Sequence, residues 1–394
     1  MKSFLKIYES SRSFQPLYFF LVLVLSFNVC EKVEAVTKFE LANGFTLLYE
    51  RGDILVGRTK TDSTNINVQG AILQKDRQDI ASFEFLKLSA IGTLHSITHI
   101  HELSFSGMSL LDGEDKLAVG QFELKNWPVG GLTENLFVHA SINSNEESKA
   151  YFFLSDLVIL KGGKTRILAV EEIQFTGHLS PVFFETLAQN EETRLQILGL
   201  RLSNQFFTEL SHSNLELILN INGLSELTKL GKNLMSSGKF NVEIVGLAEL
   251  QFEISTEITK NDYEWLFLTG RSSNEALDDL AVERRLSIIA GAFRSLRVKI
   301  IDKGFLGFYA KIAESEGLPQ LLSLIELANV LGETKAPRYT PLLAKHASKF
   351  VLEGGELGIG MNVTVPLQIR DFGLIADDLD KFFDRTMLDV VHIN

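Results

Sequence analysis

The stretch LSFSGMSLLDGEDKLAVGQFELKNW, residues 103–127, decides the fold class. Apolar side chains occupy nearly every second position on both sides of its polar centre, Asp112–Lys116. A two-residue alternation interrupted by a Gly/Asp turn is typical of a β-hairpin with one apolar face. We therefore predict two antiparallel strands here, with Leu103 and Phe105 on the side that faces a core.

The same layout recurs further along the chain and predicts an internal repeat. FLSDLVILKGGKTRILAVEEIQFTG, residues 153–177, alternates in the same way around Gly162 and Gly163. SGMSLLDG at 106–113 aligns with SDLVILKG at 155–162. Self-similarity at a fixed period indicates a repeated supersecondary unit, so we expect successive hairpins with a period of roughly 50 residues.

The rest of the chain predicts further strands and a helical C-terminal third. Alternation predicts strands at 194–204, 215–223 and 239–258, and apolar residues three and four apart predict short helices at Pro181–Gln189 and Leu224–Ser236. After residue 291 the patterns indicate a strand, a turn and three helices, then a strand and a last helix. The expected C-terminal segments are a turn at Asp302–Gly304, helices at Phe305–Glu316, Pro319–Leu331 and Thr340–Phe350, a strand at 354–369 and a helix near Asp377–Met387.

These patterns predict an α+β, β-rich fold. Repeated antiparallel hairpins would form a large curved or layered sheet, with helices concentrated in the C-terminal third. The predicted organisation is a signal peptide at 1–35, a β-rich hairpin repeat region at 36–190, a second β-rich region with short helices at 191–290, and a C-terminal α+β region at 291–394.

The N-terminal segment predicts export. Lys2, Lys6 and Arg12 precede an apolar run, and Val33–Ala35 ends in the small residue expected at a cleavage site. We expect cleavage after Ala35 and a periplasmic location. The alternative is an uncleaved anchor in the inner membrane through Leu17–Val29, although this run is shorter than the roughly 20 residues that a spanning helix needs.

Charge and cysteine content exclude several kinds of site. The formal net charge of −12 repels phosphate backbones, so we expect no nucleic-acid partner. Cys30 is the only cysteine of the chain and precedes the predicted cleavage site, so the mature chain would have no disulfide, thiolate metal site or cysteine nucleophile. Most aromatic residues are Phe, with 29 Phe against 7 Tyr and 2 Trp, which favours apolar packing.

One cluster could bind a metal. His95, His99 and His101 have the spacing H-x3-H-x-H, and the three side chains would share one face of a strand. Imidazole nitrogens are common zinc ligands, but this spacing matches no established zinc motif. The alternative is a polar strand surface. We expect no cofactor, and the sequence supplies no catalytic residues.

Three stretches carry a family resemblance. They are LSFSGMSLLDGEDKLAVGQFEL at 103–124, IIDKGFLGFYAKIAESEGLP at 300–319 and FVLEGGELGIGMNVTVPLQI at 350–369. Together they resemble uncharacterised exported proteins of alphaproteobacteria. The repeated strand-turn-strand pattern is similar to that of AsmA-like envelope proteins. The resemblance rests on apolar patterns and glycines, and it supplies no functional residues.

Two functions follow as hypotheses. The first is a non-catalytic envelope protein, a β-rich scaffold or carrier with a Phe-lined apolar sheet face that shelters an acyl chain or an envelope protein partner. In the alternative packing, helices and a second sheet fill the space over that face. The second function is an exported hydrolase whose site is assembled from distant acids or the histidines. The oligomeric state is left open.

Overall fold

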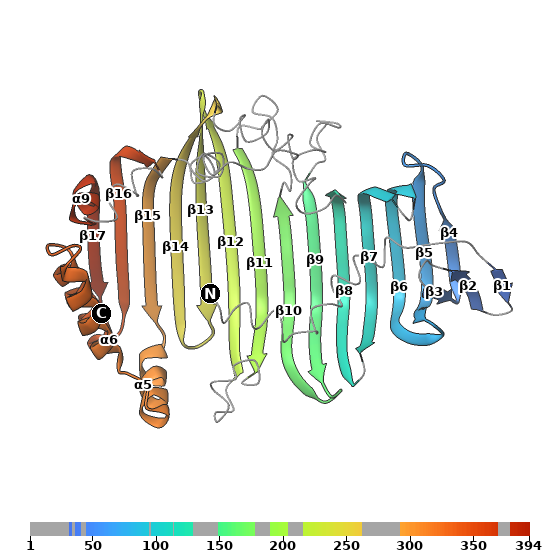
Figure 1. Ribbon diagram of the computed structural model, residues 1–394, viewed down its shortest axis with the longest axis horizontal. Coiled ribbons are helices and arrows are strands. Elements are labelled where there is room, and N and C mark those ends of the chain that lie inside the picture. Colours follow the sequence, from blue (N-terminus) through green and yellow to red (C-terminus); the bar gives the residue numbers. More distant parts are fainter. Residues whose placement is uncertain are drawn as a thin grey trace. The chain divides into compact units, whose positions relative to one another are not determined.

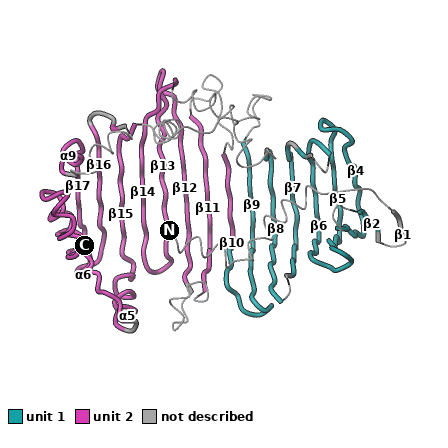
Figure 2. The backbone as a smooth tube through the Cα atoms, in the orientation of Figure 1, with its two compact units in different colours: residues 1–135, 146–170 teal, residues 136–145, 171–394 magenta. Residues whose placement is uncertain are grey.

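The computed structural model describes residues 31–33, 36–40, 45–93, 96–112, 114–128, 149–177, 190–203, 216–261, 292–368 and 379–394. The chain divides into two compact units (Figure 2). Unit 1 comprises residues 1–135 and 146–170, and unit 2 comprises 136–145 and 171–394. Of the predicted signal peptide only residues 31–33 are described, and the helix predicted at Pro181–Gln189 lies outside the described residues.

Unit 1 is an antiparallel meander of long strands (Figure 1). Strands β5 to β9 pair in chain order, while β3 and β4 both pair with one edge of β5. The strands are β1 (Glu31–Val33), β2 (Val36–Glu40), β3 (Phe45–Tyr49), β4 (Arg51–Leu55), β5 (Ser63–Lys75), β6 (Gln78–Thr93), β7 (Ser96–Asp112), β8 (Asp115–Pro128) and β9 (Ala150–Lys161). β9 also pairs with β10 (Thr165–Gly177), which belongs to unit 1 up to Val170.

Unit 2 continues with antiparallel strands and carries the helices. Strands β11 to β17 pair in chain order. The elements are β11 (Asn190–Ser203), β12 (Glu216–Leu230), β13 (Asn233–Ile244), β14 (Ala248–Thr259), β15 (Ala292–Asp302), α5 (Phe305–Glu316), α6 (Leu321–Glu333), α7 (Thr340–Glu353), β16 (Glu356–Gln368), α9 (Leu379–Arg385) and β17 (Thr386–Ile393). The predicted β-rich fold with helices toward the C-terminus is confirmed.

Both hairpins predicted from the repeated pattern are present. β7 and β8 meet at the pair Asp112 and Asp115, and the turn between β9 and β10 contains Gly162 and Gly163. Both glycines have positive φ, 58° and 64°, which a tight hairpin turn requires and glycine adopts without steric cost. The alternation therefore identified the strands and the glycines identified the turn.

The internal repeat has a structural counterpart in the backbone. Gly107 in β7 has φ 59°, and Asp156, which aligns with it in the sequence, has φ 55°. Both residues lie inside strands whose pairings keep their register there, and at Gly107 the parity of the buried side chains changes. Thus Leu103 and Phe105 are buried before Gly107, but Met108 is buried after it. Gly70 in β5 and Gly199 in β11 have the same conformation in mid-strand.

The core of unit 1 lies on one face of its strands. A cross-strand row of Ile66, Leu88, Leu103 and Leu124 is only 2–4% exposed. Beside it, Phe rings of β6 to β9 form a ladder: Phe105 stacks on Phe122 at 4.6 Å, and Phe83 and Phe152 contact this pair edge-on. Edge-on and stacked geometries are the favourable ones for aromatic pairs, so the Phe-rich composition serves packing.

Two expectations about the secondary structure are corrected. The helix predicted at Leu224–Ser236 is wrong, because β12 continues to Leu230, turns at Gly231 and Lys232, and returns as β13. The apolar spacing there fits a helix, but Gly231 has φ 64°, which a helix interior does not accept and a tight hairpin turn does. The C-terminal tail, for which no structure was expected, forms β17.

The first strand bears on the predicted signal cleavage. β1 pairs with β2 through Glu31 with Lys38 and Val33 with Val36. Cleavage after Ala35 would remove β1 and leave β2 paired with β3 alone. Processing would thus shorten the meander of unit 1 by one strand.

Candidate functional site

The most distinctive surface of unit 2 is one face of its sheet, here called the apolar face. Direct cross-strand partners lie on the same side of an antiparallel sheet, so the register defines the face. Phe240 pairs with Phe252 and Phe252 with Val298, forming one row, and Val242, Leu250 and Ile300 form the next. The apolar face consists of Leu195, Ile197, Ile221, Phe240, Val242, Leu250, Phe252, Ile254, Leu296, Val298 and Ile300.

The apolar face of unit 2 is exposed to solvent, whereas the core row of unit 1 is buried. None of its side chains is buried; most are half-buried, and Phe240 and Leu250 are 42% and 41% exposed. Large apolar side chains in a filled core are almost fully buried, as Ile66 and Leu88 are in unit 1. A contiguous exposed apolar surface of this kind marks an interaction or ligand site.

The Phe240 ring packs over the backbone of two glycines. A Cβ at Gly223 would lie 3.0 Å from Phe240 Cε1, and a Cβ at Gly238 would lie 3.3 Å from Cε2. The ring therefore lies over both neighbouring backbone segments, and its centroid is 6.5 Å from that of Phe252. The glycines let the ring lie low on the sheet at the centre of the apolar face.

Helices cover the end of this face over β16 and β17. Phe382 of α9 packs on a small core formed by Phe293, Val363 and Leu367, and partly buried Ile254 and Leu296 of the apolar face contact the same core. Phe350 of α7 contacts His392 of β17 edge-on, with ring centroids 6.4 Å apart. The covered part thus adjoins the open part over β11 to β15.

Arg338 forms ion pairs with two carboxylates of α9. Arg338, which precedes α7, contacts Asp380 through Nε at 3.1 Å and Asp384 through Nη2 at 2.6 Å. The Tyr339 hydroxyl donates to Asp384 at 3.1 Å, and the Tyr339 ring lies 5.0 Å from that of Phe383. The Asp384 and Asp380 carboxylates raise the pKa of Arg338, so its charge is retained at every physiological pH.

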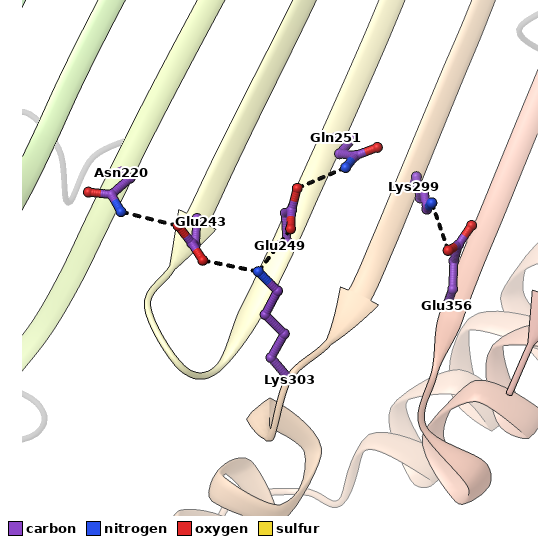
Figure 3. A network of polar contacts seen from close by, with 7 residues as sticks. All are labelled: Asn220, Glu243, Glu249, Gln251, Lys299, Lys303 and Glu356. Carbon is purple, nitrogen blue, oxygen red and sulfur yellow. Dashed lines mark hydrogen bonds and ion pairs between the residues drawn. The ribbon is translucent and has the colours of Figure 1, made fainter.

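The opposite side of the same strands is polar (Figure 3). Lys303 Nζ lies 3.0 Å from Glu243 and 2.9 Å from Glu249. The two carboxylates also accept hydrogen bonds from Asn220 and Gln251, at 3.1 and 2.8 Å. These hydrogen bonds, with the Lys303 ammonium next in importance, lower the pKa of both Glu243 and Glu249. The sheet is therefore amphipathic, with charge on one side and hydrocarbon on the other.

The histidine cluster is only partly within the described residues. His95 lies outside them, while His99 and His101 in β7 have ring centroids 4.9 Å apart. His99 is half-buried and His101 is exposed. Among the described residues no group of three His, Cys, Asp or Glu side chains is arranged to hold a metal ion. The three-histidine metal site stays a prediction.

Comparison with known proteins gives no further guide. No protein-family model matches the chain, and the search of curated proteins finds no match.

Within the described part of the chain, no helix combines the length and the hydropathy that crossing a membrane requires.

The sequence predicted an apolar sheet face but not its location. Alternation shows that each strand has one apolar side, whereas the continuity of that side across β11 to β15 depends on register. A partial signal was present: Phe240 and Phe252 stand in alternating runs on either side of Gly246. Aligning these two runs on that glycine would have predicted that the two Phe residues pair.

Proposed function

We propose that the protein is an exported, non-catalytic carrier or scaffold of the bacterial cell envelope, and that the apolar face of unit 2 binds the acyl chain of a lipid. The observation that carries the proposal is the exposure of Phe240 and Leu250 at the centre of a continuous apolar surface. Removing that surface from water is favourable, and a hydrocarbon chain would do so without leaving a polar group unpaired.

The dimensions suit an acyl chain. Neighbouring strands lie about 4.8 Å apart, so a row from β11 to β15 extends over roughly 19 Å. Half of a bilayer hydrocarbon core of about 30 Å, the depth that one acyl chain fills, is roughly 15 Å. One chain lying across the strands would therefore be in contact with apolar side chains along its whole length.

The chemistry of the face supports binding rather than catalysis. Its defining side chains carry no acid, base or nucleophile, and the nearby ionic groups, Glu243, Glu249 and Lys303, lie on the opposite side, where the Lys303 ammonium pairs with both carboxylates. Acid–base catalysis needs a titratable group within hydrogen-bond reach of the reacting atoms. The hydrolase alternative gains no support from this surface.

The lipid claim is tested by extraction and by a matched pair of variants. Lipid extracted from the purified chain with organic solvent should appear in the mass spectrum at about one molecule per chain. Phe240→Glu should weaken binding of a fluorescent fatty acid at least tenfold, since it places a charge against the acyl chain. Lys239→Gln, the adjacent residue on the other side of β13, should leave binding unchanged. The claim would be contradicted if the extract contained no lipid and if Phe240→Glu and Lys239→Gln bound the fluorescent fatty acid equally well.

The export claim has its own test. The mature chain should occur in the periplasmic fraction with Val36 as its first residue, because the small Ala35 closes the predicted cleavage site. An intact chain in the cytosol would contradict export, and an intact chain in the inner membrane would favour the anchor at Leu17–Val29.

A further inference from the structure

Helix α6 is an apolar helix that the described structure leaves uncovered. Its sequence is LLSLIELANVLGE, and none of its 13 side chains is buried. Leu324, Leu327, Val330 and Leu331 are 41–64% exposed. Adjoining apolar side chains that are this exposed on one helix mark an interaction site.

The exposed residues form a single stripe. At 100° per residue, Leu324, Leu327, Ala328, Val330 and Leu331 fall within a little less than half of the helix circumference, and the exposed Ser323 lies among them. The half-buried side chains, among them Leu321 and Ile325, lie on the other side, where α6 packs against α7. Glu326 and Glu333 border the stripe.

The chemistry of this surface fits lipid better than protein. α6 contains no Trp, Tyr or Arg, the residues that dominate protein–protein hot spots. The exposed side of the adjoining α7 combines Leu342 and Leu352 with Lys345 and Lys349 at helical spacing. Lys349 Nζ also lies 3.7 Å from Glu353, in an exposed ion pair that contributes little and leaves the ammonium accessible to phosphate. Lysine stems lie along apolar surface while their ammonium groups reach phosphate, which is the pattern of helices at a membrane interface.

The position of α6 connects this surface with the apolar face. α6 packs on α7, and α7 packs on β16 and β17. Phe350 and His392 mark that contact at the covered end of the apolar face. With 13 residues, α6 is about 20 Å long, shorter than the hydrocarbon core of a bilayer, so it can only lie along a membrane surface.

We propose that α6, flanked by the lysines of α7, is the element that contacts the surface of a phospholipid bilayer. The stripe enters the boundary between headgroups and acyl chains, and Lys345 and Lys349 meet the phosphates. The inference deepens the proposed function, because it names where a lipid carrier meets its source of lipid. It does not require the apolar face to hold a ligand, so the two claims can fail separately.

The test is sedimentation of the full chain with phosphatidylcholine vesicles. The wild-type chain should sediment with the vesicles, and Leu327→Glu/Leu331→Glu should reduce the bound fraction at least tenfold. Glu326→Gln, on the border of the stripe, is the matched control and should bind as well as the wild type. Unchanged circular dichroism and unchanged fatty-acid binding of the double variant would show that its fold is intact.

A fluorescence measurement gives an independent readout. Leu327→Trp should show a blue-shifted emission with vesicles and quenching by lipids brominated on the acyl chain, above the signal of Trp127 and Trp265 in the wild type. Absence of both vesicle sedimentation and quenching would overturn the inference. So would a wild-type dimer in light scattering that is lost in the double variant, because a second copy would then cover the stripe. The Phe240→Glu variant should still bind vesicles. Vesicle binding by a chain that binds no fatty acid would overturn only the proposed acyl site.

Discussion

Gly107 stands where the side-chain alternation of β7 changes parity. Its φ of 59° lies in the left-handed region, which costs an L-residue roughly 1–2 kcal/mol. A Cβ at this position would also collide with Glu84 Cγ of the neighbouring strand. This position therefore favours glycine for two separate reasons, the backbone conformation and the close approach of Glu84.

Gly107→Ala should destabilise the fold by more than the conformational cost alone. The matched control is Gly231→Ala, whose φ is 64° but whose added Cβ would meet nothing within 4 Å. We expect the control to lose about 1 kcal/mol and Gly107→Ala to lose about 2–3 kcal/mol, because the clash adds to the strain. Urea unfolding followed by circular dichroism measures both, and equal losses would show that Glu84 moves aside freely.

Lys303 makes the stability of unit 2 depend on pH. The pKa values of Glu243 and Glu249 are lowered from 4.5, so their contribution is complete above 4.5 and is lost as pH falls through the lowered values. The pKa of Lys303 is raised from 10.5 by the Glu249 and Glu243 carboxylates, so its contribution is complete below 10.5 and is lost at higher pH.

Lys303→Met should therefore lower the urea midpoint most between about pH 5 and pH 10. As the pH falls through the lowered pKa values of Glu243 and Glu249, the variant and the wild type should converge, because protonated carboxyls no longer attract the ammonium. Lys239→Met is the control, since Lys239 lies 3.8 Å from Glu253 in an exposed pair that contributes little. A loss that keeps the same size from pH 7 through the whole acid titration of the two carboxyls would assign the effect of Lys303 to packing instead of charge.

At the scale of elements, α9 joins the helices to the sheet with few contacts. Phe382 supplies the apolar contact, and Arg338 fixes both Asp380 and Asp384. A seven-residue helix is too short to be stable on its own, so its position depends on these tertiary contacts.

Phe382→Ala should allow α9 to detach from the sheet. A fully buried Phe→Ala change costs about 3–5 kcal/mol, so the half-buried Phe382 should cost about 2 kcal/mol. Amide hydrogen exchange in α9 and β17 should accelerate, while exchange in β11 to β14 stays unchanged. Phe240→Ala, on the open apolar face, is the comparison and should leave exchange in α9 unaffected. Uniform acceleration throughout unit 2 would show that α9 does not open independently.

The elements differ in how well local sequence predicts them. Phe305–Glu316 was predicted with the observed bounds, because Gly317 ends it with φ 68° and the turn before it contains Gly304. The hairpin at Gly231 was mistaken for a helix, since Leu at spacings of three fits one face of a helix, whereas in β12 Leu224, Leu227 and Leu230 lie on alternate faces of the strand. Local periodicity cannot decide such cases, whereas strand pairing does.

At the scale of the whole chain, composition and alternation predicted the β-rich class, and cross-strand register determined the candidate site. Phe240 and Phe252 are 12 residues apart and pair across the turn that divides the segment predicted as a strand at 239–258, but Val298, the next partner of Phe252, lies beyond residues 262–291. Long-range pairing of this kind is not encoded in any short window. The exposure of the face likewise depends on the whole tertiary arrangement, because the same alternation in unit 1 belongs to buried strands.

The measurement that tests the central claim most directly is photo-crosslinking of the full chain with palmitic acid carrying a diazirine near the end of its acyl chain. Peptides of β11 to β15 that contain the apolar face should carry the label, and Phe240→Glu should abolish it while Lys239→Gln preserves it. Label on the peptides of unit 1, or equal labelling of wild type and Phe240→Glu, would contradict the claim that the apolar face of unit 2 holds the acyl chain.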